Sequence, residues 1–186
     1  MTIRFLVLAA TVAVLGPLSA LADTVVRGKR EIAFTMKQMG VNFDGRFKGW
    51  KADVAFNPAA LDQAKATIDI DLASVDLASA DSEAEARGPQ WFNTSKFPVA
   101  HFASTSFKSL GGDRYEVAGK LALKGVTRDC VVPITVKADA SGNRIAEGAF
   151  LLKRLEYKIG EGEWADTATV ADDVRVRVRI VLPPPG

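Results

Sequence analysis

The sequence predicts an all-β protein of eight or nine antiparallel strands with one short helical segment. Apolar and polar residues alternate along almost the whole chain, turn-forming pairs such as Asn57-Pro58 separate the runs, and only 79–92 has a helical pattern. Sequential strands with one apolar face each must bury that face by closing into a barrel or by pairing two sheets. The sequence therefore predicts the fold class but does not decide between a barrel and a pair of packed sheets.

The N-terminal segment has the layout of a secretory signal peptide. Arg4 precedes an apolar run from Phe5 to Leu15, Gly16-Pro17 follows, and Ala20-Leu21-Ala22 forms an A-x-A cleavage site. The apolar run is shorter than the roughly 20 residues that a membrane-spanning helix needs. We expect residues 1–22 to be removed, leaving residues 23–186 as a single exported domain that does not span the membrane.

Charge and cysteine content exclude several classes of function. The chain has 24 basic and 22 acidic residues, and loss of Arg4 lowers the net charge of +2 to about +1, so no long-range attraction for nucleic acid is expected. Cys130 is the only cysteine and cannot form an internal disulfide. Together with the single histidine, His101, it supplies too few ligands for a zinc site, so no metal or other cofactor is expected.

The strands follow one another as runs of period two. Further strands are expected near 41–47, 98–108 and 144–153. The last run is the clearest, since its apolar residues alternate with arginines. The apolar faces of the alternating runs are Ile32, Phe34 and Met36; Trp50, Ala52, Val54 and Phe56; Ala66, Ile68, Ile70 and Leu72; Tyr115, Val117, Gly119, Leu121 and Leu123; Cys130, Val132, Ile134 and Val136; and Val174, Val176, Val178, Ile180 and Leu182.

The helical pattern covers "SADSEAEARGPQWF", residues 79–92. Good helix formers fill its first half, Asp81 is the expected N-cap, and Gly88-Pro89 is a stop signal. No period of 20–50 residues appears, so the chain is interpreted as one domain.

The inward faces mix large and small residues, which is compatible with a ligand-holding lumen and equally with a filled core. An eight-stranded barrel is just wide enough for either arrangement. If a lumen exists, the residues expected to line it and contact a ligand are Phe34, Met36, Trp50, Phe56, Ile68, Phe102, Leu121, Leu123, Val132, Ile134 and Phe150.

His101 is the one residue that suggests a nucleophilic site. Ser104 and Thr105 lie three and four positions along the same strand, about 10–13 Å away at 3.3 Å per residue, so neither hydroxyl can donate a hydrogen bond to the imidazole. No G-x-S-x-G elbow supplies another nucleophile. We therefore interpret His101 as a structural or rim residue and expect no catalytic residues.

Two charged patterns have alternative interpretations. Asp69 and Asp71 share a strand face and can either clasp a hard cation or face solvent. Arg175, Arg177 and Arg179 form a basic stripe that can meet phosphate groups or serve as a solvated outer face, and the solvated interpretation is favoured for both patterns.

Ordered segments over nearly the whole mature chain resemble the YceI-like family of exported bacterial proteins. The run Lys96-Phe97-Pro98, Phe102 with Ser104-Thr105, and Gly119 leading to Gly125-Val126-Thr127 are its most specific features. The segments are "TMKQMGVNFDGRF" (35–47), "DIDLASVDLASAD" (69–81), "WFNTSKFPVAHFASTSF" (91–107), "VAGKLALKGVTRDCVVPITV" (117–136) and "GAFLLKRLEYKIGEGEW" (148–164).

The resemblance implies an extended, lipocalin-like antiparallel barrel with an elongated apolar pore that binds polyisoprenoid chains or quinone tails. The resemblance implies no catalytic residues for this chain. Many members have a histidine where this chain has Gln38, and an Arg-Asp…His-Leu-Arg pattern where this chain has the acidic segment 79–88. The end of that region, WFNTSKFP (91–98), resembles the subgroup associated with cytochrome b561-type membrane proteins. Head-group contacts made by the Arg-Asp…His-Leu-Arg pattern are therefore not expected in this chain.

The resulting hypothesis is a periplasmic binding or carrier protein for an isoprenoid lipid or quinone. An enzyme acting on a hydrophobic substrate is the first alternative, which acids or bases converging in the lumen would support. An interaction module serving a respiratory membrane cytochrome is the second, which a large exposed apolar patch without a lumen would support.

Overall fold

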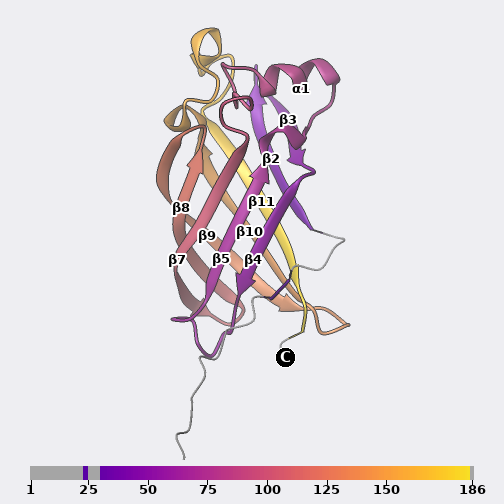
Figure 1. The fold of residues 1–186 in the computed structure, drawn as a ribbon, viewed down its shortest axis with the longest axis vertical. Helices are drawn as coiled ribbons and strands as arrows, with labels where there is room; N and C mark the ends of the chain where they lie inside the picture. Colours follow the sequence, from indigo (N-terminus) through magenta and orange to yellow (C-terminus); the bar gives the residue numbers. More distant parts are fainter. Residues whose placement is uncertain (1–22, 25–29, 185–186) are drawn as a thin grey trace, which may run out of the picture.

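The computed structural model describes residues 23–24 and 30–184, which form one curled antiparallel sheet (Figure 1). The strand order is β1-β4-β5-β7-β8-β9-β10-β11-β2-β3-β6. Its strands are β1 (Asp23–Thr24), β2 (Glu31–Gln38), β3 (Val41–Phe47), β4 (Trp50–Ala55), β5 (Lys65–Asp71), β6 (Val75–Asp76), β7 (Val99–Gly111), β8 (Arg114–Leu123), β9 (Val126–Ala138), β10 (Arg144–Lys153) and β11 (Asp173–Leu182).

The sheet curls so that its two edges come together near Lys48-Gly49, because β3 and β4 are consecutive in the chain. β3 pairs with β2 near one edge of the sheet and β4 pairs with β5 near the other, and only Lys48-Gly49 joins them. Backbone bonds across this junction run from Lys48 N to Ser74 O (3.1 Å) and from Asp71 N to Gly49 O (2.9 Å). The two edges therefore meet, and the predicted lipocalin-like barrel is confirmed.

The strand count differs slightly from the prediction. Nine strands have six or more residues, and β1 and β6 have two residues each. The two-residue strands were not predicted because period-two alternation needs a longer run to be recognised.

One feature of β7 breaks the predicted alternation. The register of β7 against β8 shifts between Ser104 and Ser106, which is a β-bulge. The extra residue lets Phe102 and Phe107 both face the interior although an odd number of positions separates them. The Ser104 hydroxyl accepts a 2.8 Å bond from Ala66 N and so ties the bulge to β5.

Helix α1 (Ala80–Arg87) is shorter than the predicted segment, and its N-cap differs. The Ser79 hydroxyl, and not Asp81, caps the helix by accepting a bond from Ser82 N at 3.2 Å. Asp81 lies in the first turn, where a carboxylate also interacts favourably with the helix dipole. The helix ends before Gly88, and three 3₁₀ turns complete the fold: η1 (Leu72–Ser74), η2 (Arg154–Tyr157) and η3 (Gly162–Ala165).

Candidate functional site

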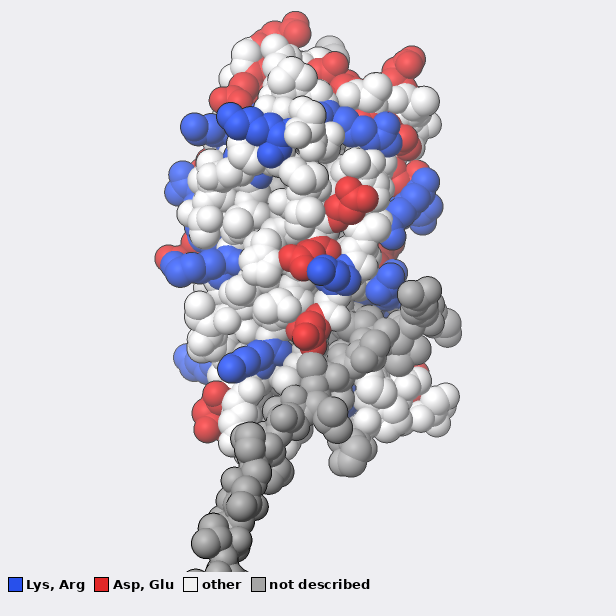
Figure 2. Space-filling view, in the orientation of Figure 1, with Lys and Arg blue, Asp and Glu red and all other residues white. Residues whose placement is uncertain are grey.

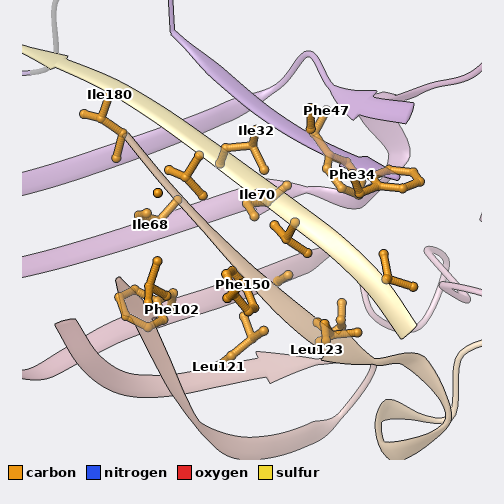
Figure 3. Close-up of a pocket in the computed structure, with 18 of the residues that line it drawn as sticks. Ile32, Phe34, Phe47, Ile68, Ile70, Phe102, Leu121, Leu123, Phe150 and Ile180 are labelled. Atoms are coloured by element: carbon orange, nitrogen blue, oxygen red, sulfur yellow. The ribbon is translucent and has the colours of Figure 1, made fainter. Parts of the chain in front are cut away.

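An elongated apolar cavity of about 210 Å³ occupies the barrel interior. Its lining runs from the end of the barrel near Ile180 and Leu182 to the end near Leu123 and Leu152, and Figure 3 shows side chains from several strands converging on it. Among the described residues, Arg154 is the only charged one that contributes to the lining. Such a cavity favours a hydrocarbon ligand.

Ten of the predicted lumen residues line this cavity: Phe34, Met36, Phe56, Ile68, Phe102, Leu121, Leu123, Val132, Ile134 and Phe150. Trp50 lies elsewhere. It is buried in the core near Ile32, and the guanidinium of Arg30 lies 4.6 Å from its ring centroid, so it fills the barrel wall and does not line the cavity.

Several lining residues were not predicted. Phe47 ends β3, Leu77 and Ala86 come from the β6–α1 region, and Trp91 and Phe92 come from the segment after the helix. Phe47 lies in a predicted strand but was not among the predicted lumen residues, whereas the other four lie outside the strands, so strand periodicity gave no signal for them. Only tertiary structure brings them to the cavity.

Glycines in the barrel wall make room for two of the lining rings. A Cβ atom on Gly119 would lie 2.5 Å from Phe102 Cζ and from Ala103 O, and a Cβ on Gly45 would overlap the ring of Phe34. Both glycines are therefore required by close side-chain approach, which explains why small residues interrupt otherwise bulky apolar faces.

A buried arginine closes the end of the cavity near η2. Arg154 is 1% exposed, and its five N–H donors all reach backbone carbonyls: Ala171 (3.1 Å), Ile159 (2.8 Å), Gly160 (3.0 Å), Trp164 (2.7 Å) and Val170 (2.7 Å). Burial lowers its pKa from the usual arginine range, while the Asp172 carboxylate opposes that effect. The carbonyls use every N–H, so Arg154 holds the loop between β10 and β11 and has no donor left for a ligand.

The opposite end is closed by aromatic rings. Phe56 lies 5.1 Å from Tyr115 in an edge-to-face arrangement of 85° and 6.0 Å from Phe107, measured between ring centroids. A second buried arginine, Arg144, donates to Phe56 O at 2.6 Å and to Pro183 O at 3.1 Å. These bonds hold β4 and the C-terminal strand together at this end.

The side of the cavity beneath α1 is covered by side chains. Phe47 lies 5.7 Å from Phe34 and 5.7 Å from Phe92 between ring centroids. Ala86 is the buried residue of α1, and it packs into the same cluster.

The predicted polar candidates lie on the outer surface. His101 Nδ1 lies 2.5 Å from the Asp69 carboxylate, and Lys51 Nζ lies 3.2 Å from it. The hydrogen bond from His101 is the largest influence that lowers the pKa of Asp69. Asp71 instead caps η1 by accepting from Ala73 N, so the two carboxylates do not converge on a cation.

The arginine stripe on β11 also faces outward. Arg177 donates to Thr35 Oγ1 at 2.7 Å, and Arg179 pairs with Glu147. Figure 2 shows both signs of charge interspersed over the face it displays, with no single charged patch. Among the described residues, no three His, Cys, Asp or Glu side chains are close enough together to hold a metal ion.

Replacing His101 or Cys130 with alanine should leave the affinity for an apolar fluorescent probe within about twofold, since neither residue lines the cavity. Burial raises the pKa of the Cys130 thiol to about 11, so it stays protonated at neutral pH and is a poor nucleophile. Probe titration checks this, with circular dichroism to confirm folding. A folded His101→Ala variant that no longer binds the probe would show that the binding site includes His101 on β7.

A curled antiparallel barrel around an elongated apolar cavity defines the lipocalin-like class of small-ligand barrels. The YceI-like domain model matches residues 24–182, and the chain belongs to this family. A UPF0312 protein of Shewanella denitrificans is 34% identical over 125 residues, which are 65% of this chain and 63% of that protein. The match therefore spans less than two thirds of that relative.

Solved structures agree with this assignment. BcnA of Burkholderia cenocepacia is 36% identical with a TM-score of 0.81, over 84% of this chain and 98% of that one. A polyisoprenoid binding domain from Saccharophagus degradans has a TM-score of 0.69 at 18% identity, over 89% of this chain and 99% of that one, and shows the shared fold. Within the part of the chain that the structure describes, no helix is long and apolar enough to cross a membrane.

Proposed function

We propose that the chain is a periplasmic binding or carrier protein that holds an isoprenoid lipid, either a polyisoprenoid or the tail of a quinone, in the barrel cavity. The observation that carries the proposal is the continuous apolar lining, to which nearly every strand contributes. Family membership supports it, as does the fold shared with a protein described as a polyisoprenoid binding domain.

Hydrocarbon burial alone can supply the affinity. Each buried CH₂ contributes about 0.8 kcal/mol, so one prenyl unit contributes roughly 3–4 kcal/mol before ordering costs. A polar anchor inside the cavity is not needed, which agrees with an arginine whose donors are all used by carbonyls.

Native mass spectrometry of protein purified from its own periplasm tests the proposal. We expect an added mass that solvent extraction releases as a prenylated lipid. Protein that is empty, or that carries only fatty acids even after exposure to prenyl lipids, would contradict it.

Export is part of the proposal, because a periplasmic carrier needs the signal peptide predicted at residues 1–22, which lie outside the described part of the chain. The exported protein should begin at Asp23, the first residue of β1. N-terminal sequencing of the exported form checks this. An exported chain that still began at Met1 would contradict the predicted cleavage.

The two alternatives gain no specific support. An enzyme would place acids or bases in the cavity, whereas its charged lining residue is an arginine bound by carbonyls. An interaction module would lack a lumen, and here a cavity is present. A b561-type membrane cytochrome stays a predicted partner that binding experiments must test.

A further inference from the structure

The rings of Phe56 and Phe107, backed by Tyr115, close one end of the cavity, and we call this layer the floor. The rings of Phe56 and Phe107 line the cavity, and the ring of Tyr115 packs behind them without lining it. Leu61 and Ala64, from the connection between β4 and β5, pack against the same core. A ligand that reaches this end therefore meets one layer of rings supported by a second layer of side chains.

Hydrogen bonds from a buried arginine side chain to two backbone carbonyls hold the backbone of this floor in place. Arg144 is 9% exposed, and its guanidinium donates to the carbonyls of Phe56 and Pro183. Moving the backbone of Phe56 outward would break a buried bond to a charged group, which typically costs more than breaking a neutral hydrogen bond. The floor therefore resists opening, and ligand entry through it is disfavoured.

The side beneath α1 is held less firmly. Its closing layer consists of the Phe34, Phe47 and Phe92 rings, which contact one another only through apolar surfaces. Side-chain bonds at the edges of α1 run from Arg87 Nε to Ala73 O (2.9 Å) and from Leu77 N to Glu83 (3.4 Å). Bonds from Phe92 N to Ala86 O (3.0 Å) and from Thr94 N to Arg87 O (3.1 Å) join the end of α1 to the segment that follows it, so the helix and this segment can move together. Since α1 buries one residue and, among the described residues, makes no buried bond to a charged group, we expect it to open at lower cost than the floor.

We propose that Phe56 and Phe107 set the length of the prenyl chain that the cavity accepts: the chain enters beneath α1 and its far end stops at these rings. This inference rests on the proposed function. Val174 and Leu182, at the two ends of the lining face of β11, lie roughly 20 Å apart along the barrel axis, from a rise of about 3.3 Å per residue and a strand tilt of about 40°.

A finite cavity predicts a break in affinity with chain length. Each added prenyl unit strengthens binding while it is buried, and units that extend beyond the cavity add little. A series of prenyl alcohols of increasing length, which share one head group, should therefore show affinity that rises and then levels off.

Shortening the floor side chains should move that break. Phe56→Ala removes a ring of about the size of one prenyl unit, so the break should shift to a chain one unit longer. The ratio of the affinity for this longer chain to the affinity for the next shorter chain should be about tenfold higher in the variant than in the unmodified protein. Phe107→Ala should act in the same direction. Phe56→Leu is a milder variant that preserves an apolar floor if the alanine variant unfolds.

Phe150→Ala is the matched control. Phe150 lines the cavity from β10, and Figure 3 places it between Ile180 near one end and Leu123 near the other. Its removal widens the cavity without lengthening it, so binding of every chain should weaken while the break stays in place. Thermal unfolding monitored by circular dichroism confirms that each variant is folded.

The possible outcomes separate this inference from the proposed function. If the unmodified protein binds no prenyl alcohol of any length, the proposed function fails. If it binds them and the break stays fixed in folded Phe56 and Phe107 variants, the proposed function stands and the length-setting role is wrong. Faster exchange of all chains without a shift of the break would make this end a gate, and would also overturn the inference.

Discussion

A folded Leu121→Arg variant should lose at least a hundredfold in affinity for an isoprenoid. Leu121 is 8% exposed and lines the cavity from β8, which is paired along its length with β7 and β9. An arginine there fills space that the ligand needs and places a charge in an apolar cavity, which costs several kcal/mol unless water enters. Isothermal titration with a prenyl alcohol, or retention of extracted lipid, measures the loss.

Two variants control for the change of side chain. Val131→Arg introduces the same cation on the adjacent strand β9, where Val131 is 51% exposed, so affinity should stay within about twofold. Leu121→Ala removes volume without adding charge, so it should enlarge the cavity and alter affinity far less.

Unfolding alone would also abolish binding, so each variant needs a melting curve. A folded Leu121→Arg protein that still extracts and holds an isoprenoid would show that the cavity is not the binding site. The interaction-module hypothesis would then become the better one.

The strands could be predicted because every long run buries one face, and burial on one face requires period two. The β8–β9 hairpin is an example: Lys124-Gly125 joins the two predicted runs, and Leu123 pairs with Val126 across it. Both turn residues have positive φ, 48° and 76°, as a tight two-residue hairpin requires.

The cavity itself could not be predicted from the same pattern. An inward-facing Leu123 or Ile134 has the same sequence signature in a filled core and around a lumen, because the difference depends on how far the sheet curls. Trp50 shows the limit of the prediction. The alternation of its strand predicts a side chain that faces the lumen, whereas its ring packs with Arg30 in the barrel wall. Leu77, Trp91 and Phe92 show the converse, since they reach the cavity from segments outside the strands.

The N-cap of α1 was assigned wrongly for a local reason. Ser79 and Asp81 are both good cap residues, and sequence alone does not tell which one has the extended backbone that a cap needs. The structure gives Ser79 a φ of −147° and places Asp81 inside the first turn.

The arginines at 144 and 154 also could not be assigned a role from the sequence, because a charged residue beside a strand is usually exposed. Arg154→Ala should lower the free energy of unfolding by about 3–5 kcal/mol, since five carbonyls around a buried site lose their donors at once. Arg154→Lys should recover only part of this, because an ammonium group has three donors and no planar fork. Urea denaturation at neutral pH measures each difference.

Arg128→Ala is the matched arginine control for this prediction. Arg128 has a 46% exposed side chain and pairs with the Glu156 carboxylate at 3.5 Å, so its removal should cost less than about 1 kcal/mol. Equal losses for the two alanine variants would show that the carbonyl cage around Arg154 adds nothing to stability. A large loss for Arg154→Ala, with the Arg128→Ala protein close to the unmodified one, would instead show that a single guanidinium stabilises the loop at this end of the cavity.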